Sequence, residues 1–431
     1  MAFRRLWQPA LVASGRRGMY KAATKDVPKV EITSKIALPD STVRNARTMN
    51  FAVGFNWTDH KKGDIDYSSC DFLAIGHDRR INEAQAEFIL SQIDDGKAAW
   101  GKTAVWPRTK DSPMVKFQEA AAEWLNAEAV VLTKSGMDAN CGLMEILLSN
   151  NDIPVYLDFL AHKTFRYGIS AAKGEMIVFK HNNLEDLEAQ MAKRGPGFII
   201  VDSLYSSLGT IVPLKDICDL ADKYGSALIV DESHGLGAHG DLGNGIVCQQ
   251  GLEDRVHFRT AGLTKGLAST GGLFTGTKEF IKLFRGNTTK SVFSYAVQDY
   301  EAVRLLTALK IVKGATDRRE SLHKKFTYLK QKMRDIGYHG YYLDQPSQIF
   351  GFCTGDYDNT VGLDRALKSK GIFPTAFTFP AAPRDRSLLR WTVTDQVTME
   401  QLDYTLGVLK QFIDDGTAKP SEWPDYERPC Y

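Results

Sequence analysis

An acidic residue ends one apolar run of this 431-residue chain and is followed by a glycine-rich loop. The run ALIVD covers Ala227–Asp231, and SHGLGAHGDLGNG follows it at once. Ligands of open α/β sheets bind beyond the carboxyl ends of strands, and a carboxylate leaving a buried strand is costly unless it meets a cation. A protonated pyridinium nitrogen is such a cation, and His234 is placed to bond a phenolic oxygen of the same ring. The alternative, which this segment alone does not exclude, is an aspartate that caps the following turn.

A lysine stands among small residues 34 positions further on. Lys265 lies in TAGLTKGLASTGGLFTG, between two strand-like runs and without another charge nearby. A lysine in such surroundings can act as a Schiff-base nucleophile, whereas a surface lysine would not need Gly266, Ser269, Gly271 and Gly272 around it. The pair formed by Lys265 and Asp231 predicts pyridoxal 5′-phosphate (PLP), a cofactor that stabilises carbanions.

Two further segments carry weaker signals. In LTKSGMDANCG, residues 132–142, a strand-like run passes through Ser-Gly into a helical pattern. Backbone N–H groups at such a helix start can bind a phosphate, although Ser-Gly turns are common. In PVYLDFLAHKTFRYG, His162 follows a strand end by four residues and could lie flat against a cofactor ring. A lone histidine is more often a packing residue, so His162 depends on the other segments.

The elements that must position these residues alternate between short apolar runs and amphipathic helical patterns. Helices are expected near Asn183–Arg194 and Leu214–Tyr224. The expected strands are Ala129–Thr133, Pro154–Asp158, Met176–Lys180, Phe198–Asp202, Ala227–Asp231, His257–Leu263 and Gly272–Gly276. This alternation predicts an α/β fold with a mostly parallel sheet sandwiched by helices.

After about residue 300 the pattern changes. A long charged helical region runs to about residue 336, and its basic cluster, which includes Lys330, is typical of a solvated helix face. It is followed by elements expected near Gln348–Thr354, Thr360–Lys370, Leu388–Val393 and Thr398–Phe412. We therefore predict an N-terminal arm (1–60), a large domain (61–300) and a smaller C-terminal α+β domain (301–431).

Composition excludes several classes of function. The 54 basic and 52 acidic residues are spread along the chain, which disfavours nucleic-acid binding. No apolar run approaches the length of a membrane span. The cysteines at 70, 141, 218, 248, 353 and 430 show no metal-binding spacing, so we expect no metal and a cytoplasmic compartment. The first 25 residues lack acids and contain four arginines, which fits a basic arm or, alternatively, a mitochondrial presequence.

The four segments, in this order, resemble the α-oxoamine synthase family of fold-type I PLP enzymes. This family includes aminolevulinate synthase, serine palmitoyltransferase, 8-amino-7-oxononanoate synthase and 2-amino-3-ketobutyrate ligase. The resemblance covers about residues 67–412 and is also carried by SSCDFLAIGHD, DSLYSSLG and FPAAPRDRSLLRWTV. Within the family it is greatest to autoinducer synthases of the CqsA type, through GPGFIIVDSLYSSLGTIVPL, LIVDESHGLGAHG, DFLAHKTF, KHNNLEDL and TGDYDNT.

The resemblance implies roles for individual residues. Lys265 resembles the Schiff-base lysine, Asp231 the pyridinium partner, His234 the residue that bonds the phenolic oxygen, and His162 the ring-stacking histidine. The other implied roles are phosphate binding by the backbone of Gly136 and Met137, cofactor and substrate contact by Ser206, carboxylate binding by Arg390, and contact of Ser294 with the partner subunit's phosphate site. The last of these implies a homodimer.

Departures from the family pattern concern the phosphate and the substrates. Gly262 stands where many members carry a phosphate-binding Thr or Ser, so either Thr260 or Thr264 substitutes for that residue or the phosphate contact is lost. Cys70 replaces the Asn of the motif S-N-x-Y-L-G, and Asp71 beside it becomes a candidate substrate-binding residue.

The implied reaction is a condensation of an amino acid, or S-adenosylmethionine, with an acyl thioester, followed by decarboxylation to an α-aminoketone. The acyl carrier is coenzyme A or an acyl-carrier protein, and the sequence does not distinguish them. Another fold-type I PLP enzyme, such as an aldolase or a C–S lyase, would share Asp231 and Lys265. A non-catalytic subunit of a palmitoyltransferase-like complex, or a binding module without cofactor, would not need Lys265.

Overall fold

The computed structural model describes residues 31–33, 36–37, 61–97, 109–379, 381–383 and 385–421. Residues 1–51 form one unit and residues 52–431 another. In the first unit, β1 (Glu31–Thr33) pairs antiparallel with β2 (Ile36–Ala37). Most of the predicted arm (1–60), including Phe51, Phe55 and Trp57, therefore lies outside the described residues.

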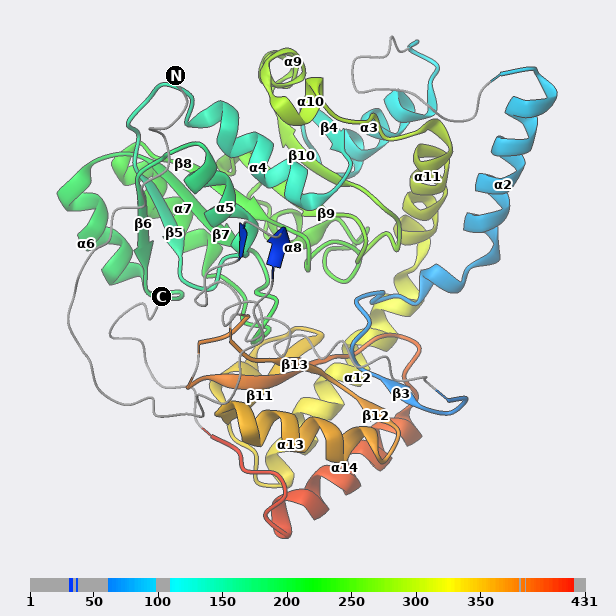
Figure 1. The fold of residues 1–431 in the computed structure, drawn as a ribbon, viewed down its shortest axis with the longest axis vertical. Helices are drawn as coiled ribbons and strands as arrows, with labels where there is room; N and C mark the ends of the chain where they lie inside the picture. The colour runs from blue at the N-terminus through cyan, green and yellow to red at the C-terminus, as the bar shows by residue number, and fades with distance from the viewer. Residues whose placement is uncertain are drawn as a thin grey trace. The chain divides into compact units, whose positions relative to one another are not determined.

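The second unit is built around a seven-stranded sheet (Figure 1). Its spatial order is β4-β10-β9-β8-β7-β5-β6, and only β10 runs antiparallel to its neighbours. The strands are β4 (Ala129–Thr133), β5 (Val155–Asp158), β6 (Met176–Phe179), β7 (Phe198–Asp202), β8 (Ala227–Asp231), β9 (Phe258–Gly262) and β10 (Gly272–Gly276). The predicted mostly parallel sheet is confirmed, with each strand within two residues of its expected bounds.

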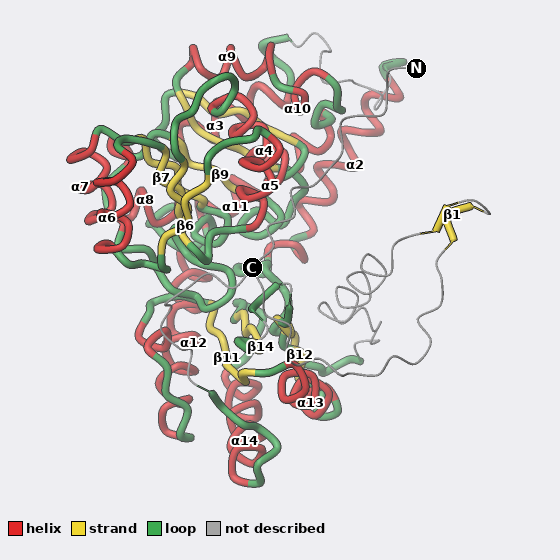
Figure 2. The backbone as a smooth tube through the Cα atoms, turned by 60° about the vertical axis from the view of Figure 1, so that its left-hand side comes forward, coloured by secondary structure: helices red, strands yellow, loops and turns green. Residues whose placement is uncertain are grey.

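Both faces of this sheet are covered because its strands are apolar on both sides. On β7, Ile199 and Val201 join the core packed by α6 and α7, whereas Ile200 joins the opposite core packed by α4 and α5. The tube in Figure 2 shows the same arrangement of helices around strands. The helices of this domain are α2 (Arg79–Asp94), α3 (Pro113–Trp124), α4 (Gly136–Leu147), α5 (Lys163–Ala171), α6 (Leu184–Arg194), α7 (Leu214–Tyr224), α8 (Gly245–Gln249), α9 (Lys278–Asn287) and α10 (Thr289–Val292).

A smaller α+β part follows. The helical region splits at Ala315 into α11 (Asp299–Gly314) and α12 (Thr316–Asp335). A three-stranded antiparallel sheet has the order β11 (Ile349–Gly355), β14 (Ser387–Thr392), β13 (Thr375–Phe377). The helices α13 (Tyr357–Lys368) and α14 (Met399–Asp414) complete it. The predicted small C-terminal domain is therefore present.

One early segment joins this smaller part. β3 (Ile65–Asp66) pairs in parallel with β12 (Ile372–Phe373), about 300 residues later in the chain. The division of residues 61–431 at position 300 remains a prediction, and this pairing argues that the small domain begins in space with β3.

Candidate active site

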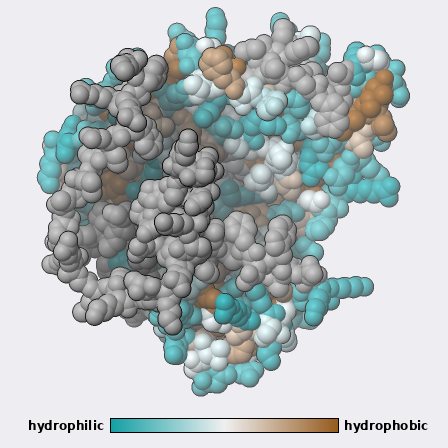
Figure 3. All heavy atoms as spheres, in the orientation of Figure 1, coloured by the Kyte–Doolittle hydropathy of each residue, from teal (hydrophilic) through white to brown (hydrophobic). Residues whose placement is uncertain are grey.

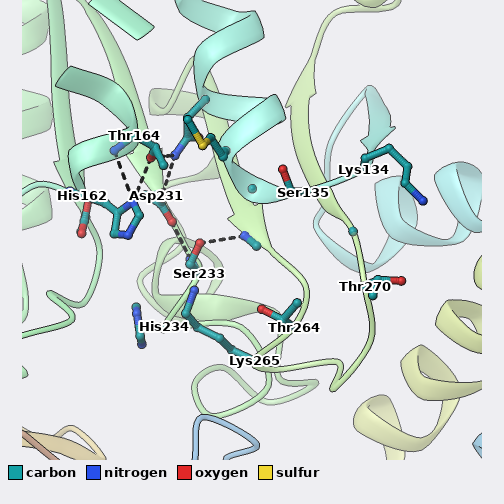
Figure 4. A pocket seen from close by; sticks show the side chains of 16 residues that line it. Lys134, Ser135, His162, Thr164, Asp231, Ser233, His234, Thr264, Lys265 and Thr270 are labelled. Carbon is teal, nitrogen blue, oxygen red and sulfur yellow. Dashed lines mark hydrogen bonds between the residues drawn. The ribbon is translucent and has the colours of Figure 1, made fainter. Parts of the chain in front are cut away.

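A cavity of about 400 Å³ opens at the carboxyl ends of the central strands. It is lined by Lys134, Ser135, Gly136, Met137, Asn140, His162, Thr164, Asp202, Asp231, Ser233, His234, Gly262, Thr264, Lys265, Thr270 and Gly271. The structure thus brings together the residues of the four chemistry-bearing segments to which chemistry was assigned: Gly136, Met137, His162, Asp231, His234 and Lys265. Figure 4 shows Lys265 reaching from its loop toward Ser233 and Asp231.

Two glycine-rich loops fix the position of Lys265. A Cβ at Gly266 would lie 2.2 Å from the carbonyl oxygen of Leu236, so this position has no room for a side chain. Gly237, on the opposing loop, has φ +84°, which favours glycine. The small residues around Lys265 therefore have a physical reason: they let its loop pack directly on the loop that carries His234.

Asp231 is buried at the end of β8 and held by two donors. Its Oδ1 accepts the backbone N–H of Ser233 at 2.8 Å, and its Oδ2 accepts the side-chain amide of Asn140 at 3.0 Å. These bonds orient the carboxylate toward the cavity. The carboxylate of Asp231 therefore lines the cavity as well as capping the turn that follows β8, the alternative that the sequence did not exclude.

Asn140 links Asp231 to His162. Its side-chain Nδ2 also donates to Thr164 Oγ1 at 2.9 Å, and that hydroxyl lies 2.9 Å from His162 Nδ1. His162 Nδ1 also accepts the backbone N–H of Thr164 at 3.5 Å, which makes Nδ1 the acceptor nitrogen and assigns the N–H of the imidazole to Nε2. The dashed lines in Figure 4 trace this network.

Both cavity histidines favour the neutral form. Burial lowers the pKa of His234 well below its usual range, and the positive charges of Lys265 and Arg390 lower it further. His162 is exposed toward the cavity, but burial of the rest of its ring lowers its pKa, against the opposing effect of Asp231. Neutral imidazoles can both accept and donate hydrogen bonds.

The phosphate end of the cavity is the start of α4. Ser135 caps this helix by accepting the N–H of Asp138 at 3.1 Å, and the helix N-terminus presents backbone amides to an anion. A Cβ at Gly136 would lie 2.9 Å from Gly262 Cα, so position 136 must stay small. Thr264 lines the cavity, whereas Thr260 is buried within β9, so of these two threonines Thr264 is the one positioned to contact a bound phosphate.

Four predicted site residues are not among those that line this cavity. Arg390, on β14, lies 4.9 Å above the Phe377 ring and donates to Cys70 Sγ at 3.7 Å. Both Asp71 oxygens already accept backbone N–H groups, from Ile75 at 3.0 Å and Gly76 at 2.7 Å. Ser206 and Ser294 are partly buried in loops. Their roles remain predictions.

Sequence reasoning missed several cavity residues. These are Lys134, Asn140, Thr164, Asp202, Ser233 and Thr270. Asn140 and Lys134 stand within the segment LTKSGMDANCG and Thr164 two residues after His162, so their positions near recognised residues were a signal. Their mutual bonds depend on the crossing of α4 and α5, which the sequence does not reveal.

Comparison with known proteins agrees with this geometry. The aminotransferase class I and II family profile matches residues 98–409. The chain belongs to that family. A CAI-1 autoinducer synthase from Vibrio campbellii is 31% identical over 387 residues, covering 90% of this chain and 95% of the relative. An 8-amino-7-oxononanoate synthase from Coprothermobacter proteolyticus is 29% identical, covering 79% of this chain and 86% of the relative.

Solved structures support the same fold. A serine palmitoyltransferase from Sphingomonas wittichii has a TM-score of 0.79 at 21% identity and covers 90% of this chain and 100% of that protein. An SPT structure with PLP has a TM-score of 0.78 at 21% identity and covers 88% of this chain and 98% of that one. The fold-type I architecture, the α-oxoamine synthase resemblance, and the prediction of a PLP-dependent acyltransferase are confirmed by these comparisons.

The residues present fit PLP, the cofactor of this aminotransferase-family chain. The ring nitrogen His234 Nδ1 is buried without a partner among the described residues, as expected if it meets the cofactor oxygen. Asp231 would hold the pyridinium, the start of α4 the phosphate, and Lys265 the aldehyde carbon. Only glycine fits at position 136, because a Cβ there would lie 2.9 Å from Gly262 Cα.

Proposed function

We propose that the cavity catalyses the condensation of an amino acid, or S-adenosylmethionine, with an acyl thioester, with decarboxylation to an α-aminoketone. The observation that carries the proposal is the convergence of Lys265, Asp231 and a neutral His162 on one cavity. The names of the relatives, a CAI-1 autoinducer synthase and 8-amino-7-oxononanoate synthases, support an acyl-transfer reaction of this type.

Each residue has a separate task in this proposal. Bound PLP delocalises the negative charge that remains when the amino acid loses its Cα proton. Asp231 would hold the ring nitrogen in its protonated form, and the free amine of Lys265 would take the Cα proton. His162 presents Nε2–H to the thioester carbonyl oxygen, where negative charge develops as the new C–C bond forms. The C–S bond then breaks and the sulfur leaves as a thiolate. The carboxyl group then departs as CO₂.

Arg390 is proposed to bind the amino-acid carboxylate. No carboxylate of the described residues pairs with this guanidinium, and its Nε is buried without a partner. A planar guanidinium binds a carboxylate through two parallel hydrogen bonds. Its charge also lowers the pKa of His234, which supports a position near the cavity. Asp71, whose oxygens are occupied by the backbone, would shape this subsite by fixing the turn beside Cys70.

We further propose that the enzyme is a homodimer. Phe293 and Tyr295 are 85% and 72% exposed, an unusual exposure for aromatic side chains, and they flank Ser294. On α2, Leu90 and Ile93 are 60% and 59% exposed, and Figure 3 shows apolar surface over this helix. Exposed apolar surface of this kind is typical of interfaces. In a dimer, Ser294 would reach the partner subunit's phosphate site.

The acyl carrier and compartment are also proposals. An acyl-carrier protein and coenzyme A both present a thioester on a phosphopantetheine arm, so the cavity chemistry fits either. No helix in the described ranges is long and apolar enough to cross a membrane. The described cysteines at 70, 141, 218, 248 and 353 are free thiols, which supports a cytoplasmic location or, with a cleaved arm, a mitochondrial one.

The test is a matrix of amine and acyl donors. Purified enzyme with PLP is given each amino acid or S-adenosylmethionine together with acyl-CoA or acyl-carrier protein, and free thiol and CO₂ are both measured. The proposal predicts stoichiometric release of both for at least one pair, abolished in Lys265→Ala. CO₂ or aldehyde release without any thiol would instead favour an aldolase or lyase, and no turnover with any pair would favour the non-catalytic subunit.

A further inference from the structure

The cavity contains a second buried carboxyl group beside Asp231. Asp202 ends β7, the neighbour of β8, and the two aspartates are register partners in the parallel ladder. Register partners project their side chains from the same face of a sheet. Asp202 and Asp231 are 3% and 4% exposed, and both line the cavity.

The two carboxyl groups differ in the number of hydrogen-bond donors that stabilise a negative charge on them. Asp231 accepts hydrogen bonds from a side-chain amide and a backbone N–H, and it lines the cavity. Asp202 accepts one described hydrogen bond, from the backbone N–H of His162 to Oδ1 at 3.2 Å. No ion pair joins Asp202 to a basic side chain within the described part of the chain. Asp231 is therefore the better-supported site for a negative charge.

The surroundings of Asp202 penalise its ionisation. Burial raises the pKa of Asp202 well above its usual range, and the nearby carboxylates of Asp231 and Asp158 raise it further. Opposing these effects are the His162 N–H and the charge of Lys265. The remaining groups on this side are already engaged or neutral: the His181 ring lies 3.0 Å from Asp158 Oδ1, and Tyr205 is a buried phenol.

We propose that Asp202 is a positioning residue that acts as a neutral carboxylic acid. Its Oδ1 holds the N–H of His162 and so fixes the start of α5, where the His162 ring stands over the cavity. Its neutrality leaves Asp231 as the single carboxylate opposite the cofactor's ring nitrogen. Two adjacent buried carboxyl groups commonly divide in this way, one charged and one protonated. Only the roles of Asp231 and His162 in this inference rest on the proposed function.

Asp202→Asn is the decisive variant because an amide copies a protonated carboxyl group. It keeps the oxygen that accepts from His162 and has no charge at any pH. We expect it to keep PLP affinity and kcat within about tenfold of the wild type. Asp202→Ala loses the acceptor, so it should lower kcat further and alter the visible circular dichroism of the bound cofactor. If kcat falls in Asp202→Ala but is retained in Asp202→Asn, the loss is due to the missing hydrogen-bond acceptor for His162. A cavity left by a smaller side chain would not explain that difference.

A second measurement uses the cofactor-free protein and does not depend on activity. Above about pH 3.9 an aspartate of the unfolded chain releases its proton, whereas the raised pKa of Asp202 keeps the proton on in the folded state. The free energy of unfolding of the wild type therefore falls as the pH rises. The Tm of Asp202→Asn minus the Tm of the wild type should therefore increase as the pH is raised from 5 to 8. The exposed Asp254→Asn is the control and should show a constant difference. Infrared difference spectra should show a protonated carboxyl band at pH 7 that Asp202→Asn lacks.

Two results would overturn the inference. One is a carboxylate rather than a carboxylic-acid signal for Asp202 in the infrared difference spectrum at pH 7. The other is a loss of activity in Asp202→Asn as large as in Asp231→Asn. Neither result would affect the proposed reaction, because that proposal fails only if Lys265 does not bind the cofactor or no thiol is released.

Discussion

The side-chain amide of Asn140 divides its two protons between Asp231 and Thr164. It donates to Asp231 Oδ2 at 3.0 Å and to Thr164 Oγ1 at 2.9 Å. Thr164 in turn contacts His162 Nδ1. One buried amide on α4 therefore orients both the carboxylate that would hold the pyridinium and, through Thr164, the ring of His162.

Removing this amide should loosen both groups. Asn140→Ala leaves Asp231 Oδ2 and Thr164 without their shared donor in a buried site, which costs about 1–3 kcal/mol of folding free energy. We expect weaker PLP binding and a lower kcat, with Asn140→Asp more damaging because it places a third carboxyl group beside Asp231. Denaturant unfolding of the cofactor-free protein and PLP titration check this. Asn287→Ala, an exposed site on α9 with one bond to Leu283, should change neither quantity; equal effects of the two variants would contradict the network.

Arg390 should control amino-acid binding more than turnover. Loss of a charge-assisted contact to a carboxylate costs about 1.5–3 kcal/mol, so Arg390→Ala should raise KM for the amino donor by ~10–150-fold. The kcat should change less, because the carboxylate is bound in both ground and transition states until CO₂ leaves. Steady-state kinetics with saturating acyl donor provide the measurement. Arg365→Ala, exposed on α13, is the matched control, and an unchanged KM in Arg390→Ala would refute the assignment.

His239 should make the protein sensitive to acid. Burial, with the nearby His323, lowers its pKa to about 4, and its Nε2 lies 3.1 Å from Gln348 Oε1. The unfolded chain, with a histidine pKa of about 6.5, binds a proton that the folded state refuses. Stability is therefore present above pH 6.5 and is lost as the pH falls toward 4, by about 2 kcal/mol at pH 5.

His239→Phe removes this proton uptake and should reduce the loss of stability between pH 7 and 5 by that amount. Urea unfolding of both proteins at the two pH values isolates the difference, since all other groups are shared. An equal loss in wild type and variant would show that His239 is protonated in the folded protein.

Substitution of the exposed aromatic residues should separate the subunits. Phe293→Ser and Tyr295→Ser place polar groups in the proposed interface, so we expect a shift from dimer to monomer in sedimentation velocity. PLP affinity should fall with it, because Ser294 would no longer reach the partner subunit. Tyr404→Ser, on α14 with a 49% exposed side chain, is the control and should stay dimeric. A wild-type monomer would remove the role proposed for Ser294.

The sheet could be predicted from the sequence because its strands are apolar on both faces and end in recognisable residues. Asp231 and Lys265 were identifiable for a related reason. Small residues cluster around each of them, and such clusters are needed where loops pack closely but not around a surface side chain. The confirmed close approach of Gly266 to Leu236 is the physical basis of that signal.

Long-range pairings could not be predicted in the same way. The meeting of Asn140 with Thr164 and of β3 with β12 depends on how helices and domains cross. Lys330 shows the limit for charge patterns: the expected solvated face is wrong here, because this lysine is 2% exposed and donates to Gln345 O at 2.8 Å. Burial lowers its pKa to about 7, so the pattern that indicated a surface cation here marks a buried amine that titrates near neutral pH.

The most direct test of the account is the site of covalent attachment of PLP. The holoenzyme is reduced with borohydride, digested and examined by mass spectrometry, alongside Lys265→Ala and Lys134→Ala, the other lysine that lines the cavity. We predict phosphopyridoxyl modification at Lys265 alone, retained in Lys134→Ala and lost in Lys265→Ala together with the visible absorption band. Modification at another lysine, or no modification after incubation with PLP, would contradict the central claim.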